Sequence, residues 1–251
     1  MKKFLYRPYR WAAIYSILLV GACTFTMIDT FVLPKSLNPS TVSVASSSTS
    51  VSASGSSSTG TTTTASQSKA VVADDSYEDE NVKISIETIR KYDSNIYIAD
   101  IQVSDPSYLK TAFANNTYGR NITETTSDIA KANNAIFAIN GDYYGFRDGG
   151  YVLRNGVAYR DTANGGDSDA LVIDKEGNLS VVKEGEGTLD SLSAKGAWQV
   201  LSFGPGLVVD GKIAVTSSSE VGKAMTSNPR TAIGQISSLH YIVIVSDGRT
   251  S

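Results

Sequence analysis

The sequence has very few of the side chains from which familiar catalytic triads are built. Cys23 is its only cysteine and His240 its only histidine. A chain with one cysteine forms no internal disulfide, so a folded domain must be held together by its core alone. Neither a Ser/His/Asp nor a Cys/His triad can be assembled, because Cys23 lies in an apolar N-terminal run and His240 stands alone in an apolar strand.

The sequence also has no cluster of positive charge beyond the N-terminus. The net charge is −3, and no Lys/Arg cluster occurs after the first ten residues. This pattern argues against a nucleic-acid partner. Asp161, Asp167 and Asp169 form an acidic cluster, but it lacks the spacing of an EF-hand loop, so a solvated loop is favoured over a calcium site. We therefore predict no metal and no cofactor.

What the sequence does have is a long apolar run over residues 11–33. Four basic residues precede it: Lys2, Lys3, Arg7 and Arg10. About 20 apolar residues span a bilayer as a helix, and the positive flank belongs on the cytoplasmic side. We predict a cytoplasmic N-terminus over residues 1–10, a single-pass transmembrane signal anchor over residues 11–33, and an extracytoplasmic remainder at the cell membrane.

Two other interpretations of this run remain open. Residues 20–23 resemble a lipoprotein cleavage box that would leave a lipidated Cys23, and a cleaved signal peptide is the third reading. The run continues past Cys23 as far as Leu33, whereas a lipoprotein tether is normally polar. A cleaved signal peptide requires a short apolar core and a small-residue site, which is not evident here. The length of the run favours the uncleaved anchor.

The rest of the chain divides into a spacer and a folded domain. Residues 34–76 are rich in Ser and Thr and bury too little apolar surface to fold, which predicts a disordered linker. Residues 77–251 alternate strand patterns with Gly, Asn and Asp turns, which predicts a strand-rich α+β domain with a mixed sheet and few helices. The expected strands cover residues 82–89, 95–103, 156–159, 170–173, 179–182, 198–203, 207–209 and 212–215.

A helix followed by a buried strand is expected near the middle of this domain. Residues 125–134 carry a helical pattern with Ser127 as a candidate N-cap. Residues 135–139 (AIFAI) are too apolar for a half-exposed strand, so a central buried strand is predicted there. Asn140, Gly141 and Asp142 follow at its end, where polar residues often form sites. A simple turn is the competing interpretation, since Asn-Gly is a common turn dipeptide.

The end of the chain is predicted to form a β-hairpin that brings charged side chains together. Strand patterns over residues 231–236 and 239–245 flank Ser237 and Ser238, which predicts an antiparallel pair with Thr231 opposite Ile244. Arg230 then lies near Ser246, within side-chain reach of Asp247. Together with Arg249, these residues would hold a phosphate beside a general base or nucleophile. Alternatively, Arg249 is a solvated surface arginine and Asp247 a turn residue.

These motifs, taken in order, resemble the phosphodiester glycosidase family, whose members include N-acetylglucosamine-1-phosphodiester α-N-acetylglucosaminidase and bacterial exopolysaccharide-related proteins. The resemblance extends from about residue 84 to residue 251. It is carried by residues 140–144 (NGDYY), 150–156 (GYVLRNG), 169–173 (DALVI), 203–211 (FGPGLVVDG), 228–234 (NPRTAIG) and 247–249 (DGR).

The resemblance implies hydrolysis between the anomeric carbon of a sugar and a phosphate oxygen. Arg230 would clamp the phosphate, with Arg249 nearby. Asp247, or else Asp142, would be the nucleophile or general base, and Asp247 is favoured by its expected nearness to Arg230. Asn140 and Thr231 would orient substrate oxygens, and Gly141 would let substrate approach the backbone. Tyr143 and Tyr144 would either stack on a sugar or pack in the core.

The expected substrate is a phosphodiester-linked glycan of surface or exopolysaccharide material. The alternative is a non-catalytic, membrane-tethered binder of anionic cell-wall glycan. The family pattern continues past the DGR loop with a helix, a strand and an Asp-Gly-Gly-Gly-Ser-Ser element that does not occur before Ser251. We therefore expect a C-terminally incomplete domain, an inactive 251-residue chain, and an open apolar edge at the strand over residues 239–245.

Overall fold

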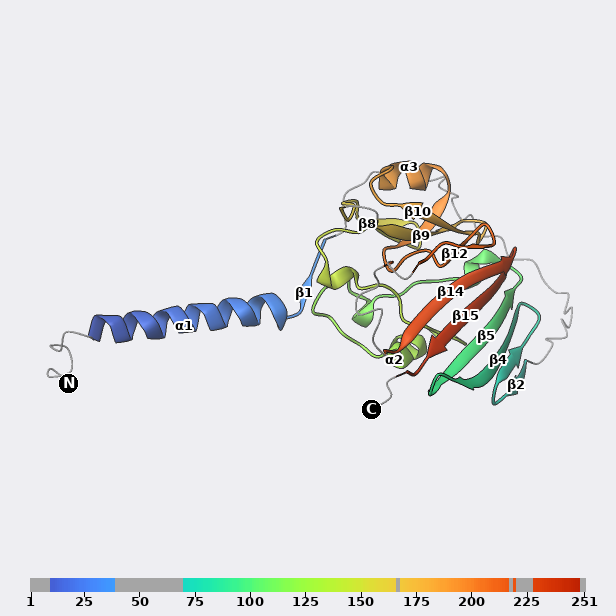
Figure 1. The fold of residues 1–251 in the computed structure, drawn as a ribbon, viewed down its shortest axis with the longest axis horizontal. Helices are drawn as coiled ribbons and strands as arrows, with labels where there is room; N and C mark the ends of the chain where they lie inside the picture. Colours follow the sequence, from blue (N-terminus) through green and yellow to red (C-terminus); the bar gives the residue numbers. More distant parts are fainter. Residues whose placement is uncertain (1–9, 39–69, 166–167, 217–218, 220–227, 249–251) are drawn as a thin grey trace, which may run out of the picture.

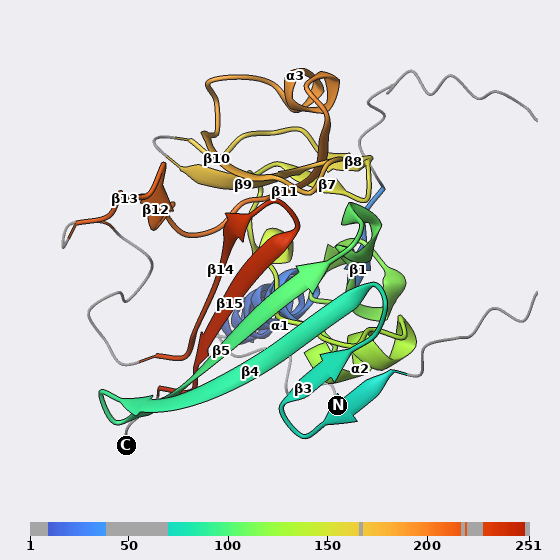
Figure 2. The ribbon, with the colours of Figure 1, turned by 90° about the vertical axis from the view of Figure 1, so that its right-hand side faces the viewer.

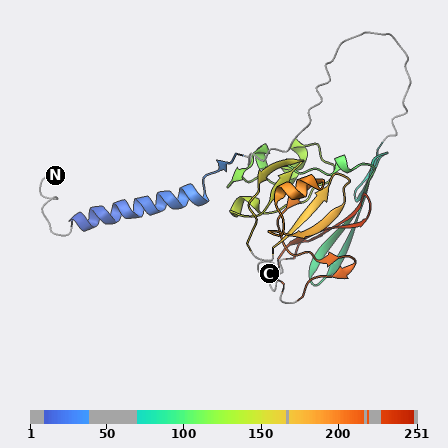
Figure 3. The ribbon, with the colours of Figure 1, turned by 90° about the horizontal axis from the view of Figure 1, so that it is seen from above.

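The predicted strand-rich α+β class with few helices is confirmed, with α-helices only at α1, α2 and α3 in the described part of the chain (Figure 1). The predicted mixed sheet is not found among the described residues, where every strand pair is antiparallel. A computed structural model describes residues 10–38, 70–165, 168–216, 219 and 228–248. The strands form two main sheets, and α1 projects away from the folded domain in two perpendicular views (Figures 1 and 3).

α1 (Arg10–Phe31) is an apolar helix of 22 residues that projects into open space. At a rise of about 1.5 Å per residue it is about 33 Å long, which matches the hydrocarbon thickness of a bilayer. It has the length and composition of a membrane span, or equally of a signal sequence near the N-terminus. The short strand β1 (Lys35–Ser36) follows and pairs with β6 (Gly119–Arg120).

The larger sheet has six antiparallel strands in the order β14-β15-β5-β4-β3-β2, and Figure 2 shows them side by side. Tyr241 and Val243 of β15 pack with Ala99 and Ile101 of β5 in its core. β2 and the first residue of β3, Ser76, fall inside the stretch predicted to be spacer. The strands are β2 (Val71–Ala73), β3 (Ser76–Glu78), β4 (Val82–Lys91), β5 (Ser94–Val103), β14 (Arg230–Ser237) and β15 (His240–Ser246).

The C-terminal hairpin forms as predicted, with its register displaced by one residue. Thr231 pairs with Val245 rather than Ile244, and Arg230 pairs with Ser246. The register shifts because Leu239 adopts a left-handed backbone conformation in the turn and an irregularity follows Gln235. The expectation of an open edge at this strand is wrong, since β15 pairs with β14 on one side and with β5 on the other.

The second sheet has five strands in the order β10-β9-β11-β7-β8 and lies beside the end of the larger sheet (Figure 2). Its core includes Leu153, Val172 and Val200, with Leu189 of α3 (Leu189–Ala194) packed against them. A separate two-stranded ribbon joins β12 (Val208–Val209) to β13 (Lys212–Ile213). The five strands are β7 (Val152–Arg154), β8 (Val157–Arg160), β9 (Asp169–Asp174), β10 (Leu179–Lys183) and β11 (Ala197–Leu201).

Polar side chains join the two sheets at the β9–β10 turn. The Tyr241 hydroxyl of β15 donates to Gly177 O at 2.7 Å. Gln235 of β14 accepts from Leu179 N at 2.9 Å. A Cβ at position 177 would lie 2.6 Å from the Tyr241 hydroxyl, so a glycine is needed for this approach. The hairpin that carries the C-terminal motifs is thereby fixed against the second sheet.

Two local predictions between the sheets are wrong. Residues 135–139 form no strand, and Ile136 is 50% exposed, although Phe137 and Ile139 are partly buried against the core of the larger sheet. The apolar composition indicates burial, but residues 135–139 have no strand partner in the described part of the chain. The predicted helix exists as α2 (Thr126–Ala132), but Thr125, not Ser127, is its N-cap and accepts from Asp128 N.

Candidate functional site

Asn140 and Thr231, from motifs 91 positions apart, meet directly. The Thr231 hydroxyl donates to Asn140 Oδ1 at 2.7 Å. Thr231 is fixed by its pairing with Val245 in the hairpin, whereas Asn140 lies in the irregular segment after α2. A Cβ at Gly141 would make only an ordinary contact, 3.7 Å from Leu201 Cδ2. Packing therefore does not explain why a glycine stands beside Asn140.

Arg230 lies at the first position of β14, next to this contact. Its backbone N donates to Ser246 Oγ at 3.2 Å, and its side chain is exposed at the end of the hairpin. The guanidinium lies near its own preceding residue, with Nη1 3.5 Å from Pro229 O. Arg230 is thus placed where the sequence predicts, at the same end of the hairpin as Asp247. Arg249 lies outside the described residues.

Among the described residues, Asn95 of β5 holds the Asp247 carboxylate. One oxygen accepts from Asn95 N at 2.8 Å and the other accepts from Asn95 Nδ2 at 2.7 Å. The backbone of Asp247 also donates to Asn95 O at 3.1 Å. Asp247 nevertheless remains exposed, so the carboxylate is fixed in orientation yet open to solvent. Its anchor was not anticipated, because Asn95 lies 152 positions earlier in the chain.

Asp142 has the opposite environment. Its side chain is 3% exposed and forms an ion pair with Arg154 Nη2 at 2.6 Å, and the Arg154 side chain is 6% exposed. The second carboxylate oxygen accepts from Ser202 N at 2.9 Å. Nη1 of Arg154 donates to the carbonyls of Leu153 and Val200. Both charged groups are buried. They pair with each other, and their other hydrogen-bond partners lie in or directly after β7 and β11.

A second buried carboxylate, Glu184, extends this polar network. One of its oxygens accepts from the Ser202 hydroxyl and from Tyr151 N, and the other accepts from Asn164 N at 2.6 Å. Glu184 and Arg154 were missed as parts of the site. The sequence carried one usable signal, an arginine at the end of the apolar strand β7, because a buried charge requires a buried partner. For Glu184, the sequence indicated only a polar turn and gave no sign of burial.

The two tyrosines after Asp142 have different roles. Tyr144 belongs to an aromatic cluster with Phe113, Tyr118 and Tyr159, and its ring stacks on Tyr118 at 5.1 Å between centroids. Burial raises the pKa of both Tyr118 and Tyr144, which keeps their hydroxyls neutral. Tyr144 is therefore a packing residue. The Tyr143 ring is 65% exposed and is the one that a sugar could reach.

Within the described part of the chain, no group of three His, Cys, Asp or Glu residues is arranged to hold a metal ion. Asp169 is held by Lys183 at 2.8 Å and by Gly206 N, Asp161 is exposed, and Asp167 lies outside the described residues. A shallow hollow of about 190 Å³ lies near Asp79 and Gln102. Since Asn95 is at the other end of β5, this hollow is separate from the candidate residues.

The part of the chain that carries these motifs is similar to known proteins. Residues 133–251 match the family described as phosphodiester glycosidase. The match begins later than the expected start near residue 84, but it contains every candidate residue except the supporting Asn95. The chain is also 32% identical over 139 residues to the SPbeta prophage-derived uncharacterized protein YomE of Bacillus subtilis (strain 168), covering 53% of this chain and 21% of that protein.

The chain thus spans about a fifth of that curated relative. The candidate residues from both motifs, including the hydrogen-bonded pair Asn140 and Thr231, all lie in the stretch that the family matches. Over residues 133–251, the predicted resemblance to the phosphodiester glycosidase family is confirmed.

Proposed function

We propose that this protein is an extracytoplasmic glycosidase that hydrolyses sugar-1-phosphodiester linkages, of the N-acetylglucosamine-1-phosphodiester type, in surface or exopolysaccharide material. The family match supports phosphodiester glycosidase chemistry in general. The single observation that carries the finer proposal is the hydrogen bond between Thr231 and Asn140. It joins Asn140, which precedes Gly141, to Thr231, which follows Arg230, and this supports a single site for the sugar and the phosphate.

The chemistry suits a site with an exposed arginine. Ordinary glycosidases need one carboxylic acid to protonate a poor leaving group and a second carboxylate to attack or to activate water. A phosphate is already a good leaving group, so a cation that stabilises its developing charge can replace the acid. Arg230 would do this through two parallel hydrogen bonds to phosphate oxygens. Gly141 would leave room for the substrate beside Asn140, since packing does not require a glycine there.

The two aspartates would divide the remaining work. Asp247 is solvent-exposed and held in one orientation by Asn95, which suits a nucleophile or general base that substrate must reach. Asp142 is buried against Arg154, which suits a positioning residue that fixes the loop carrying Asn140 and Gly141. The initial proposal that Asp142 acts on the substrate directly is the weaker of the two, because its side chain is 3% exposed.

The location of the activity follows from α1. If α1 is an uncleaved anchor with its basic flank inside, the domain lies outside the cytoplasmic membrane. Surface glycans joined through phosphodiesters would then be within reach. The length, the apolar composition and the exposure of α1 support this arrangement.

A direct assay is release of a phosphomonoester from a synthetic N-acetylglucosamine-1-phosphodiester, followed by phosphorus NMR. It should be run on the 251-residue chain and on a form extended by the helix, strand and Asp-Gly-Gly-Gly-Ser-Ser element that the family pattern predicts. We expect turnover that Asp247→Asn abolishes. Absence of turnover in both forms on any sugar-phosphodiester would end the proposal.

One observation favours the alternative of a glycan binder without activity. Each oxygen of Asp142 and of Asp247 already accepts a hydrogen bond from the protein. An exposed carboxylate held in this way, Asp247, would repel wrong ligands and shape a binding surface without attacking a sugar, while the buried Asp142 would support it. Saturable binding to an anionic glycan array, with no product and no effect of Asp247→Asn, would favour the binder.

A further inference from the structure

The connection between α1 and the folded domain is held by hydrogen bonds and an ion pair. Asn121 Nδ2 donates to Thr30 O at 3.1 Å and to Leu33 O at 3.0 Å. The last carbonyls of a helix have no partner within the helix, and here a side chain of the domain satisfies the end of α1. Lys35 then pairs with Asp29 of α1 at 2.6 Å, which closes the turn after the helix.

The segment that follows α1 is a strand of the domain. Lys35 and Ser36 form β1 and pair with Arg120 and Gly119 of β6. The pairing continues as Leu37 N donates to Tyr118 O at 2.8 Å. The chain therefore passes from the helix straight into the domain, and α1 is joined to it before residues 39–69 begin.

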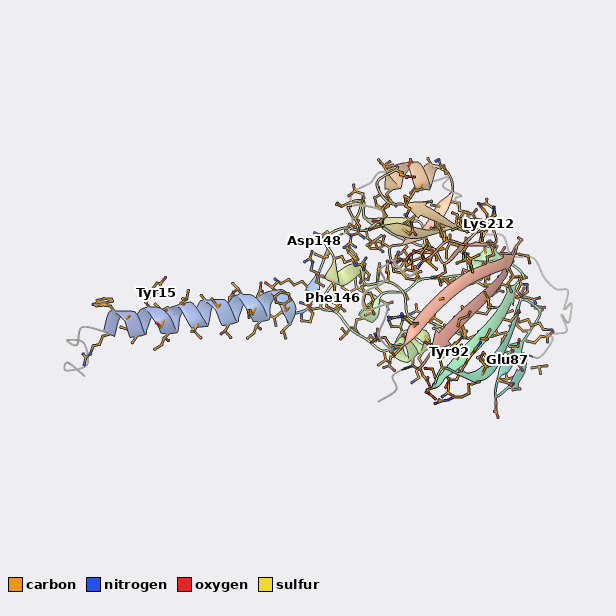
Figure 4. The ribbon with its side chains drawn as sticks, in the orientation of Figure 1. Tyr15, Glu87, Tyr92, Phe146, Asp148 and Lys212 are labelled. Atoms are coloured by element: carbon orange, nitrogen blue, oxygen red, sulfur yellow. The ribbon has the colours of Figure 1, made fainter. Side chains whose placement is uncertain are left out.

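The short helix η4 (Tyr144–Phe146) packs against β6. A Cβ on Gly145 would be 3.0 Å from Gly119 O, so the two backbones are in close contact. The Arg160 guanidinium donates to Tyr144 O at 2.8 Å and to Arg147 O at 2.6 Å, and these hydrogen bonds fix η4 in place. Phe146 is 73% exposed, and Figure 4 shows it with Asp148 on the side of the domain nearest α1.

We propose that the β6–η4 side of the domain rests on the lipid surface, held there by the β1–β6 pairing, with Phe146 at the headgroup–acyl boundary. This inference rests on the proposed membrane anchoring of α1 and not on hydrolysis. Phe31, Leu33 and Leu37 are exposed, so apolar side chains are present both at the end of the helix and at the edge of the domain. A large apolar ring beside a basic residue, here Arg147, is the arrangement that interfacial segments use on anionic lipid.

The proposal can be tested with the full chain in vesicles of phosphatidylglycerol and phosphatidylethanolamine. In a Cys23→Ser background, Phe146→Cys is labelled with an environment-sensitive fluorophore and challenged with quencher-bearing lipids. The matched control is Tyr92→Cys, because Tyr92 is 82% exposed and lies far from α1 in Figure 4. We expect the label at 146 to lose most of its fluorescence and the label at 92 to keep it.

A second pair of changes tests the β1–β6 join. Leu37→Pro removes the donor to Tyr118 O, and Asn121→Ala removes the cap on α1. Together they should restore the fluorescence at 146 while leaving the chain bound to vesicles. Equal quenching at 146 and 92, unchanged quenching after loss of the join, or failure of the full chain to stay with vesicles would each overturn the proposal. Phosphodiester hydrolysis is measured separately, so its absence would leave this result standing.

Discussion

The two aspartates that the sequence singles out lie in contrasting regions of one candidate site. Asp142 is buried at the ends of β7 and β11 in the five-stranded sheet, where an arginine and a backbone amide hold it. Asp247 is exposed at the end of the six-stranded sheet, where one asparagine orients it. Burial makes the first region a rigid support, and exposure leaves the second available to a ligand. Changes in the first should therefore act mainly on stability, and changes in the second mainly on function.

The largest expected effect is from Arg154→Met. The change leaves the buried Asp142 charge without its partner, and breaking a buried ion pair costs about 3–5 kcal/mol of unfolding free energy. Denaturant unfolding measures this. Lys175→Met, at an exposed lysine, is the control and should stay within about 0.5 kcal/mol.

The double change Arg154→Met with Asp142→Leu sharpens the same point. Replacing both members of a buried pair by apolar residues of similar volume is often close to neutral. The double variant should therefore be more stable than Arg154→Met alone. A double variant that is less stable than either single one would show that the pair is not a coupled unit.

Arg230→Lys tests the exposed region. Lysine keeps the charge but loses the planar fork that matches two phosphate oxygens, so we expect a loss of about 2–4 kcal/mol in transition-state stabilisation. The melting temperature should hardly change, because the side chain is exposed. Arg147→Lys, another exposed position, is the control for turnover. Near-normal kcat/KM in the Arg230 variant would remove Arg230 from the site.

Asp247→Asn should have a small effect on stability. The asparagine keeps one acceptor for Asn95 and loses a charge-assisted hydrogen bond, which at an exposed position costs about 1 kcal/mol. Asp142→Asn, at the buried position, should cost more because Arg154 would lose its counter-charge. Comparing the two denaturation midpoints checks the contrast directly. Equal losses would mean that burial does not distinguish the two carboxylates.

The smallest expected effect is on acid stability through Asp169. Burial alone would raise the pKa of Asp169, but hydrogen bonds from Lys183 and from Gly206 N outweigh it and lower the pKa below the ordinary value. A carboxyl group with a lowered folded-state pKa contributes stability above its unfolded pKa and loses it as pH falls through the folded value. Asp169→Asn should therefore reduce stability at neutral pH and flatten its decline below about pH 4.

Most of the strand pattern could be read from the sequence, since β4, β5, β9, β10 and the final hairpin follow alternating or apolar runs bounded by turns. Residues 135–139 mislead because apolar composition indicates burial without specifying a strand partner. The one-residue displacement of the hairpin comes from the turn at Leu239, where two serines gave no strong turn signal.

The candidate site, like the fold, could be predicted from the sequence only in part. Asn140 and Thr231 were both named as candidate residues from their motifs, but the hydrogen bond between them was not predicted. The supports Arg154, Glu184 and Asn95 were missed because each acts through a partner distant in sequence, and no local pattern shows such pairing. The sequence could not show that Tyr144 is a packing residue for the same reason, because Tyr118, on which its ring stacks, comes from another segment.

We propose that Asn140 and Thr231 act as one unit in substrate handling. The most direct test is a double-mutant cycle on kcat/KM with Asn140→Ala, Thr231→Val and the double variant, in whichever form of the chain turns over a sugar-1-phosphodiester. Residues that share a hydrogen bond at a site should show a coupling energy of about 0.5–3 kcal/mol. Effects that simply add, or turnover that neither change reduces, would contradict the account.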